Sequence, residues 1–206
     1  MNASIAQIVT WTEAEGPGKR FALWFQGCPL RCPGCCNPEF LPFAGGTVRS
    51  VSSLVEQVAA AKADHDIEGI TLLGGEPFAH AEATLALARG ARALDLSVMI
   101  FTGYRIEDLN EPQLLAVLDV TDILVDGPYE RDHPDTTRRW IGSTNQRIHF
   151  LTERYRFDDQ WRKRNTLEIR VRGNEIVVNG FPAKNAVGLW KGWTRRPVPR
   201  PDAESR

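Results

Sequence analysis

Four cysteines near the N-terminus are the residues of this sequence best suited to chemistry. Cys28, Cys32, Cys35 and Cys36 fall within nine consecutive positions, and the rest of the 206-residue chain contains no cysteine. A disulfide framework spreads its cysteines so that they join distant segments, whereas a dense group of thiols is typical of a metal site. The group therefore predicts a metal centre.

The spacing of these cysteines, C-x3-C-x2-C, lets one loop reach several corners of an iron–sulfur cube. We expect Cys28, Cys32 and Cys35 to be the three protein ligands of a [4Fe–4S] cluster. Three ligands leave the fourth iron open to a small molecule, and an open metal position is typical of catalysis. Adjacent side chains of an extended stretch point in opposite directions, so we interpret Cys36 as a packing residue in the wall of the site.

Two non-catalytic alternatives use the same loop. Zinc held by four cysteines usually has two C-x2-C pairs that are well separated in sequence, and this chain has one cysteine region. An electron-transfer ferredoxin needs a fourth cysteine ligand, and the chain offers none outside the loop. A non-catalytic iron–sulfur or zinc protein therefore stays as the alternative from another class.

The elements that position this loop alternate between strand and helix. Short apolar runs predict strands, and apolar residues at helical spacing predict helices behind the loop. Such alternation indicates parallel βα units with outer helices, in an α/β fold. The expected strands are 5–9, 21–25, 69–73, 96–101 and 122–125, and the expected helices lie around 51–58, 85–94 and 114–118.

Chemistry in such folds sits at the carboxyl ends of the strands. Three segments besides the cysteine loop fall at such ends in the expected pattern. They are Gly74-Gly75-Glu76-Pro77, Thr102-Gly103-Tyr104 and Asp126-Gly127. We therefore expect four separate segments to meet at one edge of the sheet.

Four motifs give the chain a resemblance to a known family. Cys28 to Pro38 resembles the cluster motif of the radical S-adenosylmethionine (SAM) superfamily, and Gly74-Gly75-Glu76-Pro77 matches its GGEP motif. The segments 15–20 and 140–146 are similar to those of the glycyl-radical-enzyme activases, in particular the anaerobic ribonucleoside-triphosphate reductase activating proteins. The resemblance runs from about residue 5 to about residue 150. It implies a partial (β/α) barrel, to which we add a small C-terminal β-hairpin.

The resemblance also implies residues for SAM. Glycines let backbone approach a ligand closely, and Glu76 would accept a charge-assisted bond from the methionine ammonium. The plain alternatives are a strand-to-helix turn at Glu76 and a turn-forming Asp-Gly pair at Asp126. Thr102, Tyr104 and Asn145 are weaker candidates. The expected cofactor-binding residues are Gly34, Cys36, Gly74, Gly75, Glu76 and Asp126.

The activity implied by the resemblance is reductive cleavage of SAM to a 5′-deoxyadenosyl radical. An external one-electron reductant, of flavodoxin or ferredoxin type, would supply the electron. The partner would be a glycyl radical enzyme such as anaerobic ribonucleotide reductase. The absence of further cysteines excludes auxiliary clusters of the kind used by peptide-modifying relatives. A radical SAM enzyme acting directly on a small molecule or peptide is the alternative.

Composition sets the remaining expectations. A net charge of −1 gives no global attraction to nucleic acid or membrane, and the N-terminus lacks a signal pattern, which predicts a cytoplasmic protein. The four histidines are scattered, which favours core or solvated side chains. The basic and aromatic stretch 153–164 is diluted by acids and reads as a solvated surface segment. We expect a radical SAM domain at 1–155, an appendage with a hairpin at 156–193 and a disordered tail at 194–206.

Overall fold

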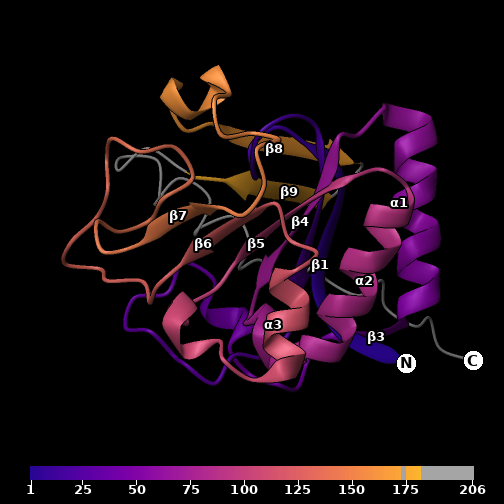
Figure 1. Ribbon diagram of the computed structural model, residues 1–206, viewed down its shortest axis with the longest axis horizontal. Coiled ribbons are helices and arrows are strands. Elements are labelled where there is room, and N and C mark those ends of the chain that lie inside the picture. The colour runs from indigo at the N-terminus through magenta and orange to yellow at the C-terminus, as the bar shows by residue number, and fades with distance from the viewer. Residues whose placement is uncertain (173–174, 182–206) are drawn as a thin grey trace, which may run out of the picture.

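A seven-stranded mixed sheet forms the centre of the molecule (Figure 1). The computed structural model describes residues 1–172 and 175–181. The strands lie side by side in the order β3-β1-β2-β4-β5-β6-β7. Their bounds are β1 (Asn2–Thr12), β2 (Arg20–Phe25), β3 (Thr47–Ser50), β4 (Gly69–Gly74), β5 (Ser97–Phe101), β6 (Ile123–Asp126) and β7 (Arg147–Phe150).

Three helices cover one face of this sheet (Figure 1). Phe21, Leu23 and Phe25 of β2 belong to the core under the helices, whereas Ala22 and Trp24 belong to a cluster on the other face. This alternation follows from the two-residue period of a strand. The helices are α1 (Val51–His65), α2 (Ala81–Ala93) and α3 (Pro112–Leu118), with short 3-10 turns η1 (Pro38–Phe40), η2 (Pro77–His80), η3 (Ile106–Asp108) and η4 (Asp159–Arg162).

The prediction of parallel βα units is confirmed for the middle of the sheet. Strands β2, β4, β5 and β6 pair in parallel, and helical crossovers join them. The sheet as a whole is mixed, because β1, β3 and β7 pair antiparallel at its two sides. Neither β3 nor β7 was expected. Each has only four residues, and β3 is largely exposed, so neither forms the apolar run that marks a buried strand.

The predicted C-terminal hairpin is confirmed as β8 (Leu167–Arg172) and β9 (Glu175–Gly180), a separate two-stranded sheet. It attaches to the residues after β1: Asn179 Nδ2 donates to Thr12 Oγ1 at 2.8 Å, and the Gly180 amide donates to Glu15 Oε1 at 2.6 Å. The expected tail at 194–206 lies outside the described residues, and the boundary after residue 155 stays a prediction. Within 1–172 and 175–181, every helix is too short or too polar to cross a bilayer.

Candidate metal and cofactor site

The carboxyl ends of the four parallel strands meet at one edge of the sheet, as predicted. Backbone hydrogen bonds join the end of β2 to that of β4 and the end of β5 to that of β6, and the Glu76 side chain joins these two pairs. The bonds run from Gly75 N to Phe25 O at 2.7 Å, from Glu76 N to Gly27 O at 2.9 Å, from Thr102 N to Val125 O at 2.9 Å and from Gly127 N to Tyr104 O at 2.9 Å.

The cysteine loop leaves β2 at this edge. Cys28 is buried, Cys32 and Cys35 are half-buried, and Cys36 is exposed, and all four are free thiols. The Cys28 amide donates to Leu41 O at 2.9 Å, and the Cys35 amide donates to Cys32 O at 3.1 Å. Gly34, at the turn between them, has φ +76°, a conformation that favours glycine. The backbone therefore folds back on itself and presents sulfur atoms from one short loop.

Cys35 and Cys36 lie in an irregular segment just after the turn at residues 33–34. The neighbouring Cys36 thiol lowers the pKa of Cys35 to about 6, whereas burial raises the pKa of Cys28 above its ordinary value. Cys35 is thus poised to ionise, as a thiolate ligand must.

The donor set fits an iron–sulfur cluster better than a single ion. Within the described part of the chain, no three side chains of cysteine, histidine, aspartate or glutamate gather around one point. Cysteines that ligate a cubane bind different irons, so they need not meet at one centre. The arrangement gives no support to the alternative of a lone zinc ion, which needs its ligands tetrahedrally around one point.

Gly74 and Gly75 allow the backbone at the end of β4 to pack closely against the backbone at the end of β2. A Cβ on Gly75 would lie 2.2 Å from the Gly27 carbonyl oxygen, and one on Gly74 would lie 2.5 Å from Trp24 Cα. These two glycines therefore let β4 pass close to the residues that lead into Cys28. Their first effect is to fix the start of the cysteine loop.

Glu76 is a buried carboxylate, 1% exposed, at the centre of the edge. Its Oε1 accepts from Phe78 N and Thr102 Oγ1, both at 2.9 Å, and its Oε2 accepts from Gly103 N at 2.8 Å. Among the described residues, no lysine, arginine or histidine forms an ion pair with it. Burial raises its pKa to about 7. The carboxylate is well oriented but lacks a cation.

Asp126, fully buried at the end of β6, has the opposite surroundings. Arg147 of β7 pairs with both of its oxygens, and His149 Nε2 lies 3.1 Å from Oδ1. The Ile106 amide also donates to Oδ2, at 2.8 Å. Although burial opposes it, this bonding holds the pKa of Asp126 below its ordinary value. No local pattern of the sequence predicts the Arg147 pairing, because Arg147 lies 21 positions away, in the short strand β7.

The weaker candidates surround the two carboxylates. Thr102 donates to Glu76. Burial raises the pKa of Tyr104, and the nearby Glu76 and Cys28 add to this effect. Asn145 Nδ2 donates to Pro128 O at 2.7 Å. Thr102 and Tyr104 thus belong to the neighbourhood of the cysteine loop, whereas Asn145 holds the turn after β6.

The two other segments that resemble the family, 15–20 and 140–146, hold parts of the sheet and its loops in place. In 140–146, Gln146 Nε2 donates to Gly127 O at 3.1 Å, so this segment holds the turn after Asp126. In 15–20, Arg20 is completely buried and bonds Thr71 Oγ1 at 2.6 Å and Ser97 Oγ at 3.0 Å. Ser97 begins β5, so Arg20 ties strands together near their amino ends. Both segments support the edge from a distance.

Comparison with known proteins agrees with this geometry. Residues 14–149 match the family described as a 4Fe-4S single cluster domain. The chain is 33% identical over 143 residues to the anaerobic ribonucleoside-triphosphate reductase-activating proteins of Salmonella typhimurium and Escherichia coli, covering 66% of this chain and 92% of each relative. It is 32% identical over 138 residues to the protein of that name from Enterobacteria phage T4, covering 65% of this chain and 85% of the relative.

Proposed function

This chain belongs to the activase group of radical SAM enzymes, and we propose that it reductively cleaves SAM in order to activate a glycyl radical enzyme. The names of its relatives point to an anaerobic ribonucleoside-triphosphate reductase as that partner. The cysteine loop and the buried carboxylate beside it support the same proposal.

In this proposal Cys28, Cys32 and Cys35 hold a [4Fe–4S] cluster as thiolates. When bound, the cluster supplies one electron and an open iron, on which radical generation from SAM depends. The depressed pKa of Cys35 keeps its sulfur ionised at neutral pH. The burial of Cys28 helps to exclude water from that side of the loop.

The uncompensated carboxylate of Glu76 is the observation that carries the SAM assignment. A buried charge is costly unless it is paired, and no cation pairs with Glu76 in the described residues. Its two oxygens accept three hydrogen bonds, and a carboxylate has about four acceptor positions, so Oε2 can accept one more. The ammonium group of SAM would supply both the missing charge and the missing donor.

Other residues of the edge have supporting roles in this proposal. Gly34 and Cys36 lie in the cysteine loop, where the superfamily contacts the adenine of SAM. Gly74 and Gly75 set the distance between β4 and that loop. We assign Asp126 a positioning role, because its carboxylate already has Arg147 as its cation.

We also infer that the sheet curves into the partial barrel of the superfamily, with its edge open to a glycine-bearing loop of the partner. An external one-electron reductant of flavodoxin or ferredoxin type would then deliver the electron.

Anaerobic reconstitution with iron and sulfide, followed by dithionite and SAM, tests the proposal directly. We expect release of 5′-deoxyadenosine, measured by chromatography. Addition of an anaerobic ribonucleotide reductase should produce a glycyl radical doublet in the EPR spectrum. Release of 5′-deoxyadenosine without a doublet would contradict the activase assignment, and no release would contradict SAM cleavage as well.

A further inference from the structure

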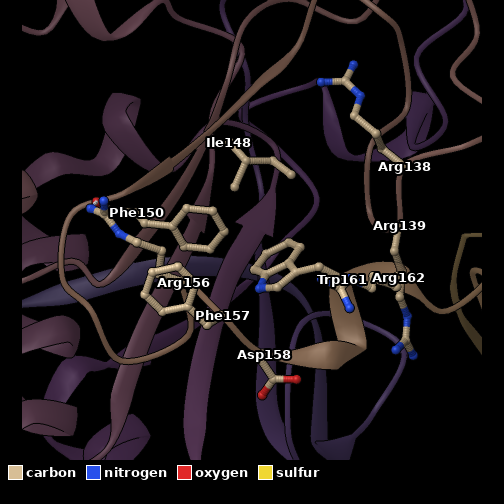
Figure 2. Close-up of a pocket in the computed structure, with 9 residues that line it drawn as sticks. All are labelled: Arg138, Arg139, Ile148, Phe150, Arg156, Phe157, Asp158, Trp161 and Arg162. Atoms are coloured by element: carbon tan, nitrogen blue, oxygen red, sulfur yellow. Dashed lines mark hydrogen bonds between the residues drawn. The ribbon is translucent and has the colours of Figure 1, made fainter.

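A cavity of about 330 Å³ lies beside edge strand β7, and no cysteine lines it. Its walls come from residues 138–139, from β7 and from residues 156–162, part of the basic and aromatic stretch of the sequence. In Figure 2, Ile148, Phe150, Phe157 and Trp161 lie together, and the arginine side chains lie around them. The cavity thus combines an apolar centre with a cationic surround.

Arg139 is the buried cation of this cavity. The residue is 5% exposed, and its guanidinium donates only to two backbone carbonyls, Gln160 O at 3.3 Å and Glu13 O at 3.4 Å. Its Nε is buried and has no hydrogen-bond partner. Within 1–172 and 175–181, no carboxylate forms an ion pair with it. The guanidinium also lies over the Trp140 ring, 4.2 Å from its centroid, so a buried cation is held here by two long carbonyl bonds and an aromatic ring rather than by an ion pair.

The other arginines of the cavity differ, because each of them has a carboxylate. One acidic side chain, Asp158, also lines the cavity, but it accepts from the Gln160 amide at 2.7 Å. Arg139 is therefore the one arginine of the cavity without an ion pair among the described residues, although Glu13 and Asp158 lie near enough to stabilise its charge. The three matched pairs are Arg138 with Asp135 at 2.6 Å, Arg156 with Glu153 at 3.1 Å and Arg162 with Asp159 at 3.5 Å.

An exposed ring forms part of the apolar side. Phe157 is 87% exposed, although it lines the cavity. Beside it, Trp161 packs edge-to-face against Phe150, with ring centroids 5.0 Å apart, and donates to Tyr155 O at 2.7 Å. Trp161 is thus engaged by neighbouring residues, whereas Phe157 has a free face. A free aromatic face beside a cation suits a planar, negatively charged ligand.

We propose that this cavity binds a nucleotide, with its phosphate at Arg139 and its base against Phe157. A guanidinium can donate two parallel hydrogen bonds to a phosphate group. Arg139 is therefore assigned to the phosphate of the nucleotide and not to its base. A volume of about 330 Å³ is at the lower end of small-molecule sites. That size favours a nucleoside monophosphate over a larger cofactor.

The cavity and the cysteine loop use different residues: none of the four cysteines, Glu76 or Asp126 lines the cavity. Nucleotide binding here consequently does not depend on the proposed function.

Isothermal titration of the full chain with adenosine 5′-monophosphate (AMP) tests the proposal. AMP should bind, and adenosine and inorganic phosphate should each bind at least about tenfold more weakly, because each keeps one of the two contacts. Phe157→Ala should weaken AMP about tenfold and leave phosphate unchanged. Arg139→Lys should weaken both AMP and phosphate about tenfold.

Arg89→Gln, which alters an exposed arginine of α2, is the matched control and should leave AMP affinity unchanged. Excess SAM should also leave it unchanged. If Arg139→Lys fails a thermal-unfolding check, Phe157→Ala carries the test, because that side chain is exposed. Absence of AMP binding at millimolar concentration would overturn the proposal, and so would AMP binding that Phe157→Ala does not weaken or that SAM displaces. Phosphate binding as tight as AMP would overturn the nucleotide assignment.

Discussion

Glu76 and Asp126 are buried carboxylates at the ends of two strands of one sheet, and they differ in what surrounds them. Asp126 has Arg147 and His149 beside it, and its pKa lies below the ordinary value. Among the residues that the structure describes, Glu76 accepts only from neutral donors, and burial raises its pKa to about 7. Asp126 is paired with a cation of the protein itself, whereas the surroundings of Glu76 leave room for a cation supplied by a ligand.

The cysteine loop belongs with Glu76 in this comparison, because its four free thiols are likewise available to a group from outside the protein. Cys32→Ala should therefore abolish cluster binding and the release of 5′-deoxyadenosine, since a cubane loses one of three ligands. Cys36→Ala is the matched control and should reduce turnover only partly. Iron and sulfide content after anaerobic reconstitution measures both variants. Equal iron loss in the two would show that Cys36 is a ligand.

Glu76→Gln should lower SAM affinity roughly 30-fold, which corresponds to about 2 kcal/mol for a lost charge-assisted bond. Asp126→Asn should change SAM affinity by less than about threefold, because its charge is used by Arg147. Equilibrium binding of SAM to the reconstituted protein gives both values. An equal loss in the two variants would remove the distinction drawn between the carboxylates.

The sequence predicted the edge of the sheet better than it predicted the pairing of its charges. Apolar runs located β2, β4, β5 and β6, and the rule for parallel strands then brought Cys28 and Glu76 to one edge. The Arg147 pairing depends on β7, a four-residue strand with no apolar run, so no local pattern indicated it. A buried cation such as Arg139 is similarly invisible, because burial is decided by segments remote in sequence.

The order of the two variants should be reversed for stability: Asp126→Asn should have the larger effect on the free energy of unfolding, and Glu76→Gln the smaller. Asp126→Asn should lower the free energy of unfolding by about 1–2 kcal/mol, since it weakens charge-assisted bonds at a buried site. Glu76→Gln should cost less, because it removes a buried charge that no cation pairs with in the described part of the chain. Asp119→Asn, at an exposed position, is the control and should change stability by less than about 0.5 kcal/mol. Urea unfolding monitored by circular dichroism measures all three.

The smallest effect is a difference in acid sensitivity that follows from the depressed pKa of Asp126. A carboxylate whose pKa is lower in the folded state stabilises the protein fully above its unfolded value, 3.8, and that contribution is lost as pH falls through the folded value. Asp126→Asn should therefore be less stable than the unmodified protein above about pH 5, and the two should converge as the pH falls below 3.8. Thermal midpoints measured between pH 3 and pH 7 test this convergence. A constant difference across that range would mean that Asp126 is not ionised against Arg147, and the contrast with Glu76 would then rest on packing rather than on charge.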